Sequence, residues 1–113
     1  MVDDKLSHNL TLNDYQDMAE TTAIYPKKVA LEYLTLGLAA EVGELTGKVA
    51  KWYRKDSAYP HSAVVDELGD VLWFVSELAR QHGIPLSDLA RKNLDKLADR
   101  KLRGALKGNG DNR

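Results

Sequence analysis

Hydrophobic residues recur at three- and four-residue intervals along four stretches of this chain, which is the spacing of amphipathic helices. The first stretch begins near Thr11, whose side chain suits an N-cap, and the second covers about residues 29 to 53. The third begins near Ser62, another candidate N-cap, and ends before Gly83, and the fourth opens around Pro85. The flanks of the β-branched runs continue the helical period, so they do not indicate strands. The pattern predicts an all-α fold, and the short connections favour an antiparallel four-helix bundle.

The second predicted helix carries two different surfaces. One is a continuous hydrophobic stripe made of Leu31, Leu34, Leu38, Val42, Leu45, Val49 and Trp52. The other is a face of small residues, Gly37, Ala40, Gly43 and Gly47. A glycine inside a helix costs about 1 kcal/mol relative to alanine. We therefore expect the small-residue face to admit a closely packed helix or to leave room for a ligand.

The composition limits the class of protein. The 113 residues suit one domain spanning 1–113, in which about residues 104 to 113 form a flexible or ligand-contacting tail. With 43% hydrophobic and 29% charged residues, the chain is neither disordered nor built for a membrane. It shows no secretory signal and no cysteine, so a cytoplasmic protein without thiolate chemistry is expected. The formal net charge of −1 argues against broad binding to nucleic acid.

Two pairs of acids interrupt the segments that are best suited to form the core. Glu41 and Glu44 lie three residues apart in the second helix, and Glu67 and Asp70 do so in the third. Residues at this spacing project to the same side of a helix, with Cβ atoms about 5–6 Å apart. Each acid immediately precedes a hydrophobic residue of its helix. Antiparallel packing of the two helices would therefore bring the four carboxylates to one edge of the core.

Four converging carboxylates would repel one another and would be costly to bury unless a cation neutralised them. An all-oxygen set of ligands favours Mg²⁺, with Mn²⁺ as an alternative, over zinc. No histidine joins the four positions, which argues against a ferritin-like di-iron site. Acids at this spacing are also common on ordinary solvated helix faces, so a surface without a metal is the competing interpretation.

The acid pairs resemble the sequence pattern of the MazG-like family of all-α nucleoside triphosphate pyrophosphohydrolases, a Glu-rich EExxE motif followed by ExxD. Here the motifs read A-E-V-G-E at 40–44 and E-L-G-D at 67–70, with 22 residues between them. The segment NLDKLADRK is similar to the N-x-x-K-L-x-x-R pattern of the family's last helix. Ala40 replaces the first acid of EExxE, so a role of that acid does not apply to this chain.

The resemblance implies Mg²⁺-dependent hydrolysis of a (d)NTP to a (d)NMP and pyrophosphate, in nucleotide-pool housecleaning. By position, the metal ligands would be Glu41, Glu44, Glu67 and Asp70. Glu41 or Glu44 would also activate the attacking water. Asn93 is expected on or beside the buried stripe of the last helix, where it would contact the substrate or serve as a structural amide. The basic residues that would bind the substrate's phosphates, or instead carry solvated surface charge, are Lys96, Arg100, Arg103 and Lys107. The family's assembly implies a homodimer or a homotetramer.

Other interpretations fit the same sequence. A base-specific dUTP or dCTP pyrophosphatase, or a relative of phosphoribosyl-ATP pyrophosphatase, would keep the fold and change the substrate. A non-catalytic helical interaction module would keep the fold and leave the acids solvated. Trp52 and Trp73 lie at core spacing, although either could stack on a base, and Tyr15 and Gln16 are weaker candidates for base recognition.

Overall fold

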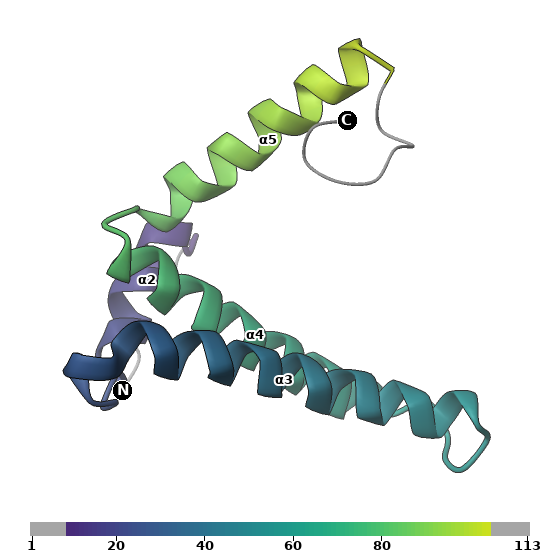
Figure 1. Ribbon diagram of the computed structural model, residues 1–113. Helices are drawn as coiled ribbons and strands as arrows, with labels where there is room; N and C mark the ends of the chain where they lie inside the picture. The colour runs from purple at the N-terminus through teal and green to yellow at the C-terminus, as the bar shows by residue number, and fades with distance from the viewer. Residues whose placement is uncertain (1–8, 105–113) are drawn as a thin grey trace.

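The computed structural model describes residues 9–104, and within that range the chain forms helices and no strand (Figure 1). The α-helices are α2 (Leu12–Glu20), α3 (Ala30–Tyr53), α4 (His61–Gln81) and α5 (Leu86–Leu102), and a short 3-10 helix, η1 (Lys27–Val29), precedes α3. The predicted all-α class with four helices is confirmed. None of these helices is both long and apolar enough to cross a membrane. Most of the expected C-terminal tail, residues 105–113, lies outside the described range.

The two long helices, α3 and α4, lie side by side and run antiparallel (Figure 1). α3 ends where Lys55 adopts the left-handed backbone conformation, with a φ of 67°. The N–H of Asp56 then donates to the carbonyl of Lys51 at 2.8 Å, which satisfies one of the last free carbonyls of the helix. This tight turn lets the chain reverse direction within a few residues and pair α4 with α3.

Two of the three predicted helix-capping residues are confirmed. Thr11 caps α2, because its Oγ1 accepts a backbone N–H of the first turn at 3.0 Å. Gly83 follows α4 with a φ of 68°, the left-handed conformation that glycine adopts without strain. The expected N-cap at Ser62 is wrong. Pro60 occupies the N-cap of α4, and its carbonyl already accepts the first helical hydrogen bond at 2.9 Å.

α2 packs against α4 and α5 and fixes the turn between them. The side chain of Gln16 is buried at this junction. Its amide nitrogen donates to the carbonyls of Ser76 at 3.2 Å and Ile84 at 3.1 Å. Its amide oxygen accepts the N–H of Leu86 at 2.9 Å. The Gln16 amide is thus engaged in holding α5 to the rest of the chain, and a role in base recognition stays a prediction.

A completely buried carboxylate, that of Glu77 on α4, ties three segments together. Arg80 donates to it at 2.7 and 3.2 Å, and the hydroxyl of Tyr25 donates at 2.8 Å. Gln81 donates to the same hydroxyl at 3.0 Å, and Arg80 also reaches Glu20 on α2 at 3.0 Å. Burial on its own raises the pKa of Glu77, but the hydrogen bonds from Arg80 and Tyr25 outweigh it and lower the pKa. Glu77 is therefore an ionised, fully partnered core residue.

The small-residue face of α3 packs closely at one position and is open at others. A Cβ atom at Gly37 would collide with the ring of Phe74 on α4, so glycine is required where these two helices approach. No atom of a neighbouring element in the described chain lies within 4 Å of a Cβ built at Gly43 or Gly47. Close helix packing is confirmed at Gly37, and the rest of the face borders open space.

The core of the isolated chain is small, and one face of the α3–α4 pair is uncovered. The hydrophobic residues that are buried are Ala19, Tyr25, Ala30, Leu34, Ala79 and Leu86. The α3 stripe is buried at Leu34 but 41% exposed at Val42, and Leu68 on α4 is 51% exposed. α5 diverges from the α3–α4 pair (Figure 1), and side chains of all three helices and the turn before α5 line an open apolar groove of about 300 Å³. These exposed apolar side chains and the groove form a surface, rather than the single scattered hydrophobic residues that are ordinary on a protein surface.

Candidate metal centre

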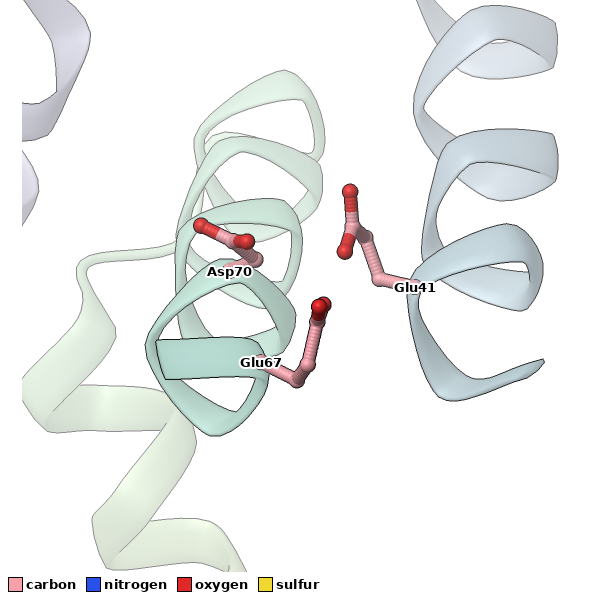
Figure 2. A group of neighbouring side chains, drawn as sticks. All are labelled: Glu41, Glu67 and Asp70. Atoms are coloured by element: carbon pink, nitrogen blue, oxygen red, sulfur yellow. The ribbon is translucent and has the colours of Figure 1, made fainter. Parts of the chain in front are cut away.

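Three acidic side chains from two helices meet between α3 and α4. Glu41 projects from α3 and Glu67 and Asp70 from α4, and their carboxylates point toward one shared space (Figure 2). One oxygen of each residue lies within 4.8 Å of the other two. The close approach of Gly37 and Phe74 sets this register, because Glu41 stands one helical turn after Gly37 and Asp70 one turn before Phe74.

Glu41 and Glu67 differ in their affinity for protons. Burial raises the pKa of Glu41 to about 7, and a hydrogen bond with Glu67 and the charges of Glu44 and Asp70 add to this effect. The pKa of Glu67 is lowered instead, first by a hydrogen bond from Lys48 and then by the one with Glu41. The Nζ of Lys48 lies 3.2 Å from Oε1 of Glu67. Without a metal, Glu41 is therefore protonated below about pH 7 and bonded to an ionised Glu67.

Glu44 lies at the margin of this cluster. Its side chain is exposed, and it does not belong to the group whose oxygens come within 4.8 Å of one another. Its charge still contributes to the raised pKa of Glu41, which shows that it is near. The structure thus brings together three of the four predicted ligands, and a role of Glu44 as ligand or base stays a prediction.

The cluster fits a hard divalent cation. Oε2 of Glu41 and Oε2 of Glu67 are buried and have no hydrogen-bond partner in the described part of the chain. A buried carboxylate oxygen without a partner is costly, and so is the repulsion between neighbouring carboxylates. A cation bound between the two helices would relieve both costs. Since all the available donors are carboxylate oxygens, Mg²⁺ or Mn²⁺ suits them better than zinc does.

Cation binding is expected to weaken as the pH falls below about 7. Glu41 must be ionised to act as a ligand, and with a pKa of about 7 it holds its proton below that pH. The apparent Kd for Mn²⁺ should rise about tenfold for each pH unit below 7 and level off above it. Electron paramagnetic resonance of free Mn²⁺ measures this Kd. The variant Glu41→Gln should lose the pH step, and a wild-type Kd that is constant between about pH 5.5 and 7 would contradict the prediction.

The predicted substrate-binding residues lie on α5 in different environments. Asn93, expected on or beside the buried stripe, is exposed, because α5 diverges from the α3–α4 pair. Asn93 and Lys96 line an open groove of about 290 Å³. Arg100 is buried, and Arg103 forms an exposed ion pair at 2.8 Å with an acid one turn earlier. Lys107 lies outside the described residues. Contact of any of them with a substrate stays a prediction.

The two tryptophans differ in their surroundings. The indole N–H of Trp73 donates to Oγ1 of Thr22 at 2.8 Å, and its ring packs edge-on against Phe74 with centroids 5.0 Å apart. Trp52 is 43% exposed and packs edge-on against Tyr59 with centroids 5.1 Å apart. The core interpretation therefore suits Trp73, whereas Trp52 presents its ring to solvent at the end of α3.

The acid pattern alone does not point to Lys48, which the structure places against Glu67. A signal for it was nevertheless available in the sequence. Lys48 follows Glu44 by four residues, and a glutamate four residues before a lysine places both side chains on the same side of a helix. Glu44 in turn follows Glu41 by three residues, so Glu41, Glu44 and Lys48 are all expected on one side of the helix. This spacing places Lys48 beside the predicted site.

The protein is thus an all-α protein in which two antiparallel helices both contribute carboxylates to a site suited to a divalent cation. The sequence model of the MazG nucleotide pyrophosphohydrolase domain matches residues 30–103, a range that contains the whole cluster, and the chain belongs to this family. The chain is also 44% identical over 109 residues to "Gene 37 protein" of Mycobacterium phage L5, which corresponds to 88% of this chain and 96% of the phage protein. No solved structure gave a significant match.

Proposed function

We propose that this protein is a Mg²⁺-dependent pyrophosphohydrolase that converts a (d)NTP and water to a (d)NMP and pyrophosphate. The observation that carries the proposal is the meeting of Glu41, Glu67 and Asp70 between two helices, with two buried oxygens that lack partners in the described chain. Membership of the MazG nucleotide pyrophosphohydrolase domain family supports this reaction class. Mn²⁺ is the proposed alternative to Mg²⁺.

The chemistry follows from what the carboxylates can hold. A divalent cation held there would neutralise charge on the phosphate oxygens and orient them. Glu41, Glu67 and Asp70 would bind it, with Glu44 as a further ligand. The water oxygen forms a bond to one of the two phosphorus atoms joined by the α–β bridging oxygen, and the bond from that phosphorus to the bridging oxygen breaks. The bridging oxygen leaves with the other product, and the water proton passes to a carboxylate. Glu41 and Glu44 are the proposed candidates for that base.

We propose a standard or damaged (d)NTP as the substrate and housecleaning of the cytoplasmic nucleotide pool as the role. The residues proposed to contact the nucleotide are those of the last helix and the segment after it, Asn93, Lys96, Arg100, Arg103 and Lys107. The basic members suit phosphate oxygens, and arginine can form two parallel hydrogen bonds to one phosphate. The groove lined by Asn93 and Lys96 gives two of them a common surface.

A nucleotide panel tests the proposed reaction. The purified protein is incubated with each standard (d)NTP, with an oxidised dNTP, with dUTP and with phosphoribosyl-ATP, in the presence of Mg²⁺, Mn²⁺ or EDTA, and the products are separated by ion-exchange chromatography. We expect equal amounts of monophosphate and pyrophosphate, only when a metal is present. Turnover restricted to dUTP, dCTP or phosphoribosyl-ATP would identify a base-specific or phosphoribosyl-ATP pyrophosphatase. Release of orthophosphate would reject the proposal, and so would a complete lack of turnover, which fits a non-catalytic helical module.

We also propose that the protein works as a homodimer, or as a homotetramer built from such dimers. Exposed apolar residues directly follow the acids of the cluster: Val42 follows Glu41, and Leu68 follows Glu67. The apolar groove beside α5 extends this surface. A second copy presents the same apolar face, so a two-fold interface would cover both surfaces at once and enclose the acid cluster on that side.

The oligomer proposal predicts the result of a single surface substitution. Leu68→Asp should convert a wild-type dimer to a monomer, because it places a charge in the proposed apolar interface. Sedimentation equilibrium measures the mass of each species. Ile24→Asp is the matched control, since Ile24 is 94% exposed in the segment between α2 and η1 and should leave the dimer intact. A wild-type protein that sediments as a monomer at micromolar concentration would contradict the proposal.

A further inference from the structure

Lys48 places an ammonium group against the carboxylate cluster. Its Nζ lies 3.2 Å from Oε1 of Glu67, one of the two carboxylates that α4 contributes between the helices. Lys48 follows Glu44 by one helical turn and Glu41 by two, so the three side chains project from the same side of α3. The Lys48 side chain is 37% exposed, whereas that of Glu67 is 11% exposed. The Lys48 ammonium thus lies between the nearly buried Glu67 carboxylate and solvent.

This arrangement is unfavourable for a metal site on its own. The lysine occupies one oxygen of Glu67 and leaves the other, Oε2, buried without a partner in the described chain. A positive charge in contact with a ligand repels an incoming divalent cation, because like charges a few ångströms apart interact strongly near a protein surface. A lysine at this position is therefore expected to weaken cation binding, and a compensating role would explain its presence.

A phosphate group provides such a role. Lysine carries a compact charge with three donors on a flexible stem, which suits phosphate oxygens. Resting on the proposed function, we propose that Lys48 holds the Glu67 carboxylate in the metal-free protein and turns to a phosphate oxygen of the substrate once Glu67 has bound a cation. The same residue then opposes binding of the cation alone and favours binding of the cation together with a phosphate chain.

As proposed, Lys48 weakens the binding of the cation alone and strengthens the binding of phosphate. These opposite effects distinguish the proposal from a purely structural ion pair. If Lys48 only supported the fold around Glu67, its removal would disorder the cluster and weaken the binding of cation and phosphate alike. If Lys48 acts as proposed, its removal strengthens the binding of cation alone and weakens that of phosphate. Lys48→Met retains most of the apolar stem and removes the charge, and Lys48→Arg retains the charge.

Two binding measurements on the full chain test the proposal without depending on turnover. Mn²⁺ alone is titrated and followed by electron paramagnetic resonance, and the Kd of Lys48→Met should fall about tenfold relative to wild type. Inorganic tripolyphosphate, a phosphate chain without a base, is titrated by calorimetry at fixed Mg²⁺. Its Kd should rise about tenfold in Lys48→Met, the loss expected for one charge-assisted hydrogen bond, and Lys48→Arg should recover most of it.

Lys51→Met is the matched control, because Lys51 is an exposed lysine of the same helix and should change neither Kd. Weaker or unchanged Mn²⁺ binding by Lys48→Met would overturn the proposal, and so would unchanged binding of tripolyphosphate. If the wild-type protein hydrolyses none of the nucleotides but the two Kd values shift in opposite directions, the proposed function fails and the phosphate role of Lys48 stands. Circular dichroism of each variant confirms that the helices are retained.

Discussion

Replacement of Asp70 by Asn should remove most of the proposed pyrophosphohydrolase activity while leaving the helices intact. Asp70 is an exposed member of the group whose oxygens lie within 4.8 Å of one another, and asparagine keeps its shape but not its charge. Loss of a group that only orients a metal ligand typically lowers activity about 10- to 100-fold. Loss of a proposed ligand should therefore lower kcat/KM at least about a hundredfold, measured as pyrophosphate release with Mg²⁺.

The effect of Mg²⁺ on the Tm of Asp70→Asn distinguishes a metal site from a solvated acid face. Burial, a hydrogen bond with Glu67 and the charges of Glu44 and Asp70 raise the pKa of Glu41, so the loss of one of these charges relieves repulsion in the metal-free protein. The Tm of Asp70→Asn without metal should be unchanged or higher than that of wild type. The increase in Tm on adding Mg²⁺ should shrink, because ligands stabilise only the state that binds them.

Asp66→Asn is the matched control for Asp70→Asn. Asp66 is an exposed acid of the same helix, adjacent to Glu67, and it does not belong to the cluster. The Asp66→Asn variant should retain both the activity and the Mg²⁺-dependent increase in Tm. Full activity of Asp70→Asn would show that the cluster is not the catalytic centre, and equal losses in both variants would point to a general effect of charge on α4.

The composition of the acid cluster could be predicted because helix geometry restricts where side chains point. Three-residue spacing places Glu67 and Asp70 on one side of α4, and antiparallel packing then brings Glu41 to the same region. The difference between Glu41, which is half-buried, and Glu44, which is exposed, could not be predicted. It depends on the depth of each side chain between two helices, and spacing along one helix carries no information on that depth.

The extent of the core was harder to predict than the helices that form it. Hydrophobic periodicity identifies a face that must be covered, but it does not identify what covers it. Leu34 is buried within the chain, whereas Val42 and Leu68, which continue the same patterns, are exposed in the isolated chain. Asn93 is exposed for a related reason, because α5 turns away from the pair that its stripe was expected to contact.

The spacing of Glu77 and Arg80 does not indicate how deeply this ion pair is buried. Glu77 and Arg80 stand three residues apart, as do many exposed ion pairs, yet Glu77 is completely buried. Its burial depends on Tyr25, which approaches from 52 residues away in the sequence. Contacts between residues so distant in the chain arise only from the tertiary packing of α4 against the segment before α3, and no local pattern reports them.

Substitution of Glu77 by Gln should destabilise the protein strongly. Glutamine keeps the size of the side chain but removes the charge that Arg80 and Tyr25 donate to in a completely buried position. Breaking such a pair leaves the remaining groups poorly satisfied, and we expect the free energy of unfolding to fall by about 3 kcal/mol at pH 7. For a chain of this size the Tm should fall by roughly 10–20 °C, measured by differential scanning calorimetry.

The pH dependence of this loss identifies its cause. Because the folded-state pKa of Glu77 is lowered, its charge stabilises the protein above the unfolded pKa of about 4.5, and this stabilisation disappears as the pH falls through the folded pKa. The difference in stability between wild type and Glu77→Gln should therefore be constant near neutral pH and shrink below about pH 4.5. Glu20→Gln removes the exposed partner of the same arginine and should cost less than about 1 kcal/mol. Equal effects of the two substitutions would show that burial of the Glu77 charge contributes little.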